Sequence, residues 1–245
     1  MKYIDHNYKK GGTQKDFYGS NDVEIVNCLS CSSEESSLVH KEFGNIGIVK
    51  CNACELLYTN PRPKKIELNY HGNIKNYFEE YKYIINGSKS HHRDRNYIQE
   101  INIIKKYFIS GKLLDVGCNA GRFLYLAQKS GFNSVGVEPS KPLAKIGVEN
   151  FGLNIKNCTL EDSDFLPKSI EIITAIDVFE HLTNPKSFLL KSYEVLKDDG
   201  ILVIKVPNGN YTLTKFKIAK LLRKNTENMD IFDSYEHVAH YNKKT

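Results

Sequence analysis

Four cysteines near the start of the chain have the type and spacing of a metal site. Cys28 and Cys31 form one Cys-x-x-Cys pair, and Cys51 and Cys54 form a second pair after 19 intervening residues. Each such turn directs two sulfur atoms at one point, so two turns on facing hairpins complete the tetrahedral thiolate set that Zn²⁺ prefers. A redox dithiol needs one pair and not two matched ones. The spacing therefore predicts a structural zinc ribbon with no coordination position left open for catalysis.

A turn with two glycines follows an apolar strand pattern near the middle of the chain. Leu113-Leu114-Asp115-Val116 leads into Gly117, and Gly121 comes four residues later. Glycine lets the backbone approach a ligand at the carboxyl end of a strand, where doubly wound sheets bind their ligands. A dinucleotide fingerprint would need glycine at Asn119 and Arg122, and no P-loop Gly-Lys-Ser/Thr follows. The turn therefore predicts a pocket for an adenosine-bearing cofactor that carries no phosphates.

An acidic residue closes the next predicted strand, Val135-Gly136-Val137-Glu138, 23 residues after Asp115. A carboxylate in that place can accept hydrogen bonds from both hydroxyl groups of a ribose. We therefore predict that Glu138 holds the ribose of the cofactor.

A first cluster of acidic and histidine residues follows the strand pattern at 170–176. Asp177, Glu180 and His181 would share one face of a helical turn. Two roles are open to them: binding a divalent cation such as Mg²⁺ or positioning a hydroxyl group, and packing and capping beneath the cofactor.

A second cluster lies close to the end of the chain. It contains Glu236 and His237, with Tyr235 before them and His240 behind. Histidine can take a proton from a hydroxyl group, and an adjacent carboxylate raises its basicity. This cluster is our candidate for the proton acceptor.

Apolar strands and helices alternate from residue 111 to residue 206. This spacing indicates an α/β fold with a doubly wound, mostly parallel, Rossmann-like sheet that is covered on both faces. The strand patterns cover 112–116, 134–138, 154–157, 170–176 and 201–206. Helix patterns cover 97–108, 121–130, 142–151, 185–196 and 212–224.

Composition divides the chain into five parts. They are a flexible arm at 1–20, the zinc ribbon at 21–63, a helical connector or cap at 64–110, the cofactor-binding core at 111–206, and a substrate-side lid at 207–245. Only 39 residues follow Val206, fewer than such folds usually carry, so we expect the lid to be truncated.

The composition also excludes some classes of partner. The formal charge of +5 comes from lysines spread along the chain, so we expect no nucleic-acid partner. No apolar run approaches the ~18 residues that a membrane span needs, and the start of the chain lacks the apolar stretch of a signal peptide. We therefore expect a cytoplasmic protein without a membrane span.

The stretch from Leu113 to Val206 resembles the class I S-adenosylmethionine-dependent methyltransferases. In that family the segment 115–121 cradles the methionine end of the cofactor, the position of Glu138 holds the ribose, and the segment 159–162 lines the adenine. The resemblance implies S-adenosylmethionine as the cofactor. The cofactor contacts that we expect are Asp115, Gly117, Cys118, Asn119, Gly121, Glu138, Pro139, Thr159, Leu160, Glu161 and Asp177.

A narrower resemblance spans nearly the whole chain. The cysteine pairs, then Tyr58-Thr59-Asn60-Pro61-Arg62-Pro63, then this core are similar to bacterial methyltransferases that modify sugars of surface polysaccharides and antibiotics. In those proteins a Glu-His pair is the acid–base pair, which implies that role for Glu236 and His237, with His181 as a further catalytic candidate. Their tyrosine stands two residues before the glutamate, where this chain has Ser234.

The resemblance implies O-methylation of a sugar hydroxyl on a nucleotide-activated sugar or glycan precursor. One alternative is C-methylation of a keto sugar, in which His237 or a tyrosine removes a proton from carbon. Another is O-methylation of a quinone or phenol with Asp177, Glu180 and His181, since a similar cluster in related quinone O-methyltransferases is associated with Mg²⁺. The last is a module that binds the cofactor and turns nothing over.

Overall fold

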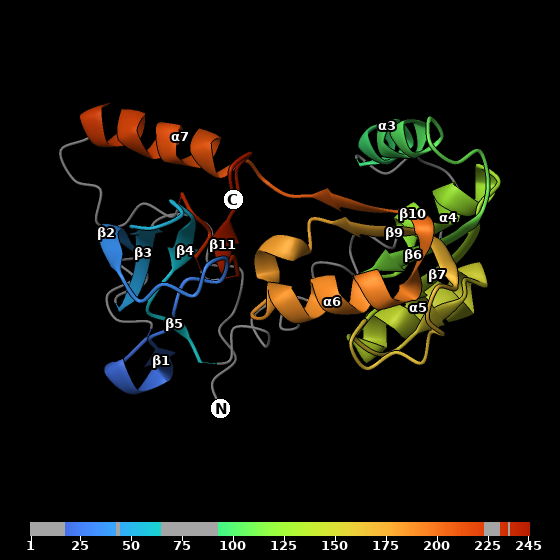
Figure 1. Ribbon diagram of the computed structural model, residues 1–245, viewed down its shortest axis with the longest axis horizontal. Helices are drawn as coiled ribbons and strands as arrows, with labels where there is room; N and C mark the ends of the chain where they lie inside the picture. The colour runs from blue at the N-terminus through green and yellow to red at the C-terminus, as the bar shows by residue number, and fades with distance from the viewer. Residues whose placement is uncertain (1–17, 43–44, 65–92, 223–230, 235) are drawn as a thin grey trace. The chain divides into compact units, whose positions relative to one another are not determined.

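A computed structural model describes residues 18–42, 45–64, 93–222, 231–234 and 236–245 (Figure 1). The chain forms two compact units, and each is described by itself. The first unit draws its described residues from 1–72, 179–186 and 206–245, and the second from 73–178 and 187–205. Most of the predicted arm and residues 65–92 of the predicted connector lie outside the described residues.

The second unit is built on a five-stranded parallel sheet. Its strands lie in the order β10-β9-β6-β7-β8, and every neighbouring pair is parallel. The side chains of β6 from Leu113 to Val116 are all buried, as expected for a strand covered on both faces. The predicted doubly wound α/β fold is confirmed. The strands are β6 (Lys112–Val116), β7 (Asn133–Val137), β8 (Ile155–Lys156), β9 (Ile170–Ile176) and β10 (Leu196–Lys205).

Helices α4, α5 and α6 lie between strands close to the predicted places, whereas α3 precedes β6 and both begins and ends earlier than predicted. One core cluster joins α3 and α4 to β6 and β9 through Ile104, Phe123, Leu113 and Ile172. A second cluster places Leu143 and Ile146 of α5 against Ala120. None of the helices in the described part of the chain is both long and apolar enough to cross a bilayer. The helices are α3 (Asp94–Ile104), α4 (Arg122–Lys129), α5 (Lys141–Phe151) and α6 (Pro185–Val195).

The last strand, β10, begins earlier than the sequence predicts. Leu196 already pairs with Ile170, whereas Ile201 pairs with Ile172, so the stretch between them bulges out of the ladder. The pattern Asp198-Asp199-Gly200 is typical of a turn, which is why the sequence predicts that the strand begins only at residue 201.

The first unit contains the four cysteines and the end of the chain. Its four-stranded antiparallel sheet has the order β11-β4-β3-β2, so the short strand near the C-terminus joins the sheet of the ribbon. Helix α7 (Gly209–Leu222) contributes Phe216 to a core with Ile48, Leu57 and Phe232. The other elements are η1 (Ser20–Asp22), β1 (Val23–Glu24), β2 (Ser36–Glu42), β3 (Ile46–Cys51), β4 (Leu57–Thr59), β5 (Arg62–Pro63), η2 (Phe179–His181) and β11 (Ala239–His240).

Candidate functional site

The two cysteine pairs of the first unit stand on two turns with the same backbone pattern. The carbonyl of Cys28 accepts from the amide of Ser32 at 2.8 Å, and the carbonyl of Cys51 accepts from the amide of Glu55 at 3.1 Å. Ser32 and Glu55 both have left-handed backbone angles, with φ of 62° and 68°. The backbone therefore bends in the same way around each pair and turns both thiols of the pair toward one side.

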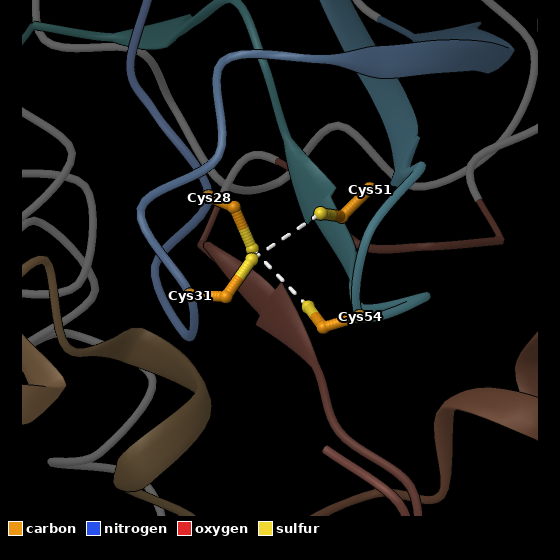
Figure 2. A group of neighbouring side chains, drawn as sticks. All are labelled: Cys28, Cys31, Cys51 and Cys54. Carbon is orange, nitrogen blue, oxygen red and sulfur yellow. Dashed lines mark hydrogen bonds between the residues drawn. The ribbon is translucent and has the colours of Figure 1, made fainter.

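The four sulfur atoms point toward one another (Figure 2). The Sγ atoms of Cys28 and Cys54 lie 3.5 Å apart, and those of Cys31 and Cys51 lie 3.6 Å apart. Tetrahedral coordination with Zn–S bonds of ~2.3 Å requires separations of about 3.8 Å. All four sulfurs lie within 4.8 Å of one another, so this donor set fits a structural zinc ion.

The predicted cofactor turn of the second unit connects β6 to α4. Gly117, Asn119 and Gly121 all have positive φ, at 65°, 55° and 82°. A Cβ on Gly117 would come within 2.6 Å of Val178, and one on Gly121 within 2.4 Å of Leu153. Positive φ favours glycine at both positions, and the space beside each is filled by a neighbouring side chain, so the turn packs tightly against the rest of the unit.

Glu138 joins this turn to the loop after β7. One carboxylate oxygen accepts from the amide of Asn119 at 2.9 Å, and the other accepts from the amide of Ser140 at 2.8 Å. Burial raises the pKa of Glu138 above its ordinary value, whereas these two amides lower it. Each oxygen keeps a further lone pair, so the carboxylate can hold the turn in place and still accept from a ribose.

Asp115 lies inside the sheet, where Thr174 on β9 donates to its carboxylate at 2.6 Å. Burial raises the pKa of Asp115 to about 7, against the effect of that hydrogen bond. The structure thus gives Asp115 a supporting position under the turn. Cys118 is also buried, and its sulfur fills the space beside Gly136 of β7.

The residues predicted to line the adenine form a short turn after β8. Thr159 and Asp162 hydrogen-bond each other, the side chain of Leu160 is buried, and Glu161 is exposed. Asn157, which the sequence analysis did not single out, donates its amide to the carbonyls of Glu138 and of the exposed Pro139, each at 2.9 Å. Asparagine often hydrogen-bonds the backbone of the loop in which it lies, so its position just after a short strand was the sequence signal that could have identified Asn157.

Replacing Glu138 by glutamine is expected to weaken S-adenosylmethionine binding about 10- to 100-fold. The amide of glutamine offers one acceptor oxygen, so either Asn119 or Ser140 loses its partner and the ribose loses a charged acceptor. Titration calorimetry measures the change. Glu149→Gln on the exposed surface of α5 is the matched control and should keep the affinity of the unaltered protein. Equal affinity for the two variants would contradict this role.

The first unit brings the two predicted acid–histidine clusters together in part. Donor atoms of Glu180, His181 and His237 lie within 4.8 Å of one another, although η2 and the C-terminal segment are far apart in sequence. The rings of His181 and His237 meet edge to face at 4.7 Å. The Glu180 side chain is buried, and the His237 side chain is 17% exposed. These are groups that can accept and share a proton.

The other members of the predicted clusters have different surroundings. Asp177 belongs to the second unit, where it forms an ion pair with Arg93 at 3.3 Å. Glu236 places its carbonyl oxygen 3.1 Å from Nδ1 of His181. A carboxylate that the sequence analysis missed, Asp233, lies 4.0 Å from Nε2 of His237. Asp233 precedes His237 by four residues, a spacing that could have indicated this contact from the sequence. Tyr235 lies outside the described residues.

His240 is buried beside these groups, and its ring packs edge to face on Phe232 at 5.4 Å. Burial, and then the charge of His237, lower the pKa of His240 to about 3 from its ordinary 6.5. His240 therefore stays neutral at physiological pH and is poorly suited to take a proton.

This buried histidine is expected to make the protein sensitive to acid. Between pH 6.5 and 3 the unfolded chain takes up a proton that the folded state refuses, so stability is lost as the pH falls through this window. From pH 7.5 to pH 5, His240 should cost about 2 kcal/mol of unfolding free energy. Urea unfolding at both pH values should show a smaller loss for His240→Phe, since other titrating groups are common to both proteins. An identical loss would contradict the assignment.

Comparisons with known proteins identify the family and the fold. The sequence profile of a family described as a methyltransferase domain matches residues 90–245, more than half of the chain. A structure of a S-adenosylmethionine-dependent methyltransferase from Thermotoga maritima, a possible histamine N-methyltransferase, superimposes with a TM-score of 0.52 at 18% identity. That match covers 73% of this chain and 75% of the other, and it shows the fold.

Curated relatives are ubiquinone biosynthesis O-methyltransferases. The protein from Cereibacter sphaeroides is 30% identical over 104 residues, covering 40% of this chain and 42% of the relative. The protein from a Bradyrhizobium species is 32% identical over 106 residues, covering 41% of each chain. The match thus spans about two fifths of the length of these relatives. On the family match, which covers more than half of the chain, the chain belongs to the methyltransferase-domain family.

Proposed function

We propose that the protein methylates a hydroxyl group of a phenol or quinol, with His237 as the proton acceptor. The observation that carries the proposal is the meeting of Glu180, His181 and His237 in a family whose curated relatives here are quinone-pathway O-methyltransferases. These relatives favour the phenolic acceptor over the sugar acceptor that the narrower sequence resemblance implies.

The residues of the second unit fit S-adenosylmethionine. Beside the turn at 117–121, both carboxylate oxygens of Glu138 keep a lone pair that a ribose could use. When bound there, S-adenosylmethionine supplies an activated methyl group on sulfur, so the protein has to align the acceptor oxygen with the methyl carbon and exclude water.

The residues of the cluster would handle the proton of the acceptor. A phenol ionises near pH 10, so a base is needed to form its oxyanion at neutral pH. The imidazole of His237 would take this proton, and the carboxylates of Glu180 and Asp233 would stabilise the resulting imidazolium. Glu180, His181 and His237 also have the types that hold a divalent cation, which the assay below includes.

A sugar hydroxyl is the second candidate acceptor. It is favoured by the four-cysteine module and the C-terminal histidine segment, which share one sheet through β4 and β11. Zinc-containing sugar methyltransferases resemble this chain in having both a cysteine module and a C-terminal histidine segment, which the cofactor-binding core alone would lack.

An acceptor panel distinguishes the two candidates. Purified protein with S-adenosylmethionine is offered a polyprenylated catechol and a set of nucleotide-activated sugars, each with and without added Mg²⁺, and products are weighed by mass spectrometry. We expect the catechol to gain one methyl group, about 14 Da. Methylation of a nucleotide sugar alone would overturn the phenolic assignment and establish the second candidate.

A further inference from the structure

We propose that the zinc ribbon is the scaffold that positions His237 for proton transfer, and that Thr59 is the positioning residue that links the two. The inference deepens the proposed function and depends on it for the role of His237. It assigns to the ribbon a task beyond its own folding.

Thr59 is the last residue of β4 and is fully buried. Its hydroxyl donates to the carbonyl oxygen of His237 at 2.6 Å, and its amide donates to the carbonyl of Val238 at 3.0 Å. Immediately afterwards, Ala239 pairs with Tyr58 in the antiparallel ladder of β11 and β4. One strand of the ribbon thus fixes the backbone on which the His237 side chain stands.

The same stretch of backbone also fixes the partners of His237. The amide of Val238 donates to the carbonyl of Glu180 at 2.9 Å. On the other side of His237, the carbonyl of Glu236 lies 3.1 Å from Nδ1 of His181. Both neighbours of His237 in the chain are therefore hydrogen-bonded to η2, so a shift of this segment against β4 would move the histidine and its partners out of register.

A second strand of the ribbon holds the residues that precede His237. Glu42, at the end of β2, is buried and accepts the amides of Ile231, Phe232 and Ser234 at 3.0, 3.1 and 3.2 Å. Buried carboxylates with several amide donors form strong, directional contacts. The described residues on both sides of His237, Ile231–Ser234 and Val238–His240, are thus attached to the ribbon sheet.

The cysteine turn continues directly into this scaffold. The amide of Cys51 donates to the carbonyl of Leu56 at 2.9 Å, and β4 begins at the next residue. Since β4 has three residues and its partner β11 has two, metal ligation at Cys51 and Cys54 would supply much of the order of β4. Zinc would therefore act on the reaction at a distance, through Thr59.

The test removes one hydrogen bond and keeps the volume. Thr59→Val lacks the donating hydroxyl, and Thr59→Ser keeps it. Thr214→Val, on the exposed face of α7, removes a similar hydroxyl contact of 2.8 Å and is the matched control. Ring-nitrogen NMR of His237 and the kinetic constants for methyl transfer are recorded for each. We expect Thr59→Val to shift the His237 resonances and lower kcat about tenfold.

Three further readouts make the test specific. In Thr59→Val the zinc content and the Kd of S-adenosylmethionine should be unchanged, and Thr59→Ser should restore kcat and the resonances. Unchanged His237 resonances in Thr59→Val, or an equal effect of Thr214→Val, would overturn the proposal. The NMR readout needs no acceptor. If the resonances shift but His237→Ala leaves turnover intact, the role of His237 as base fails and the scaffold stands.

If Thr59→Val does not fold, a second experiment on the unaltered protein tests the same proposal. Zinc is withdrawn stepwise from the unaltered protein with a chelator while the His237 resonances are followed. We expect them to change in proportion to the zinc removed. Resonances that keep their positions after complete loss of zinc would overturn the proposal.

Discussion

Cys54→Ser is expected to release the zinc ion and unfold the ribbon. Cys54 supplies one of four sulfurs that gather within 4.8 Å of one another, and serine is a poor zinc ligand. Structural zinc contributes on the order of 10 kcal/mol of binding free energy that is also folding free energy, more than a small antiparallel sheet can replace. Zinc content by elemental mass spectrometry and the Tm of the protein measure both effects.

The chain offers a matched control for this experiment. Cys158 stands outside the four-sulfur group, so Cys158→Ser should keep one zinc per chain and a nearly unchanged Tm. A Cys54→Ser protein that also retained one zinc and its Tm would contradict the ribbon assignment.

His237→Ala is expected to lower kcat by about two to four orders of magnitude while S-adenosylmethionine still binds. The hydrogen bonds of Glu138 that hold the cofactor turn do not involve His237, so the substitution should leave them intact. General-base loss has a distinctive signature with a phenolic acceptor. As the pH approaches the acceptor's own pKa of ~10, the oxyanion forms without a base, so the kcat of the variant should rise toward that of the unaltered protein.

The pH dependence separates this role from a structural one. A kcat that stays low at every pH would indicate that His237 only supports the fold. A kcat equal to that of the unaltered protein at pH 7 would contradict its role in the reaction altogether.

Local signals in the sequence predict much of the second unit. The strand β9 is found at the residues expected, Ile170–Ile176, because a strand buried on both faces carries a nearly continuous apolar pattern, here interrupted by Glu171 and Thr174. The cofactor turn is marked by Gly117 and Gly121, whose backbone angles and crowding other residues tolerate poorly. Asn119 could stand between them because asparagine accepts positive φ more readily than most residues.

The histidine cluster could not be predicted as a whole. Glu180 and His237 are brought together by β11, a strand of two residues that carries no pattern of its own. Its pairing with β4 is set by tertiary hydrogen bonds, such as those of Thr59, and by the packing of Phe232 and Phe216. Sequence spacing found the two halves of the cluster separately. It also grouped Asp177 with Glu180 and His181, whereas the structure pairs Asp177 with Arg93.

The most direct test follows a labelled methyl group. The protein is incubated with S-adenosylmethionine that carries a trideuterated methyl group, together with the polyprenylated catechol. The account predicts one trideuteromethyl group on an acceptor oxygen for each S-adenosylhomocysteine formed, with transfer reduced at least a hundredfold in His237→Ala at neutral pH. Tight binding of S-adenosylmethionine with no labelled product on any hydroxyl acceptor of the panel would contradict it.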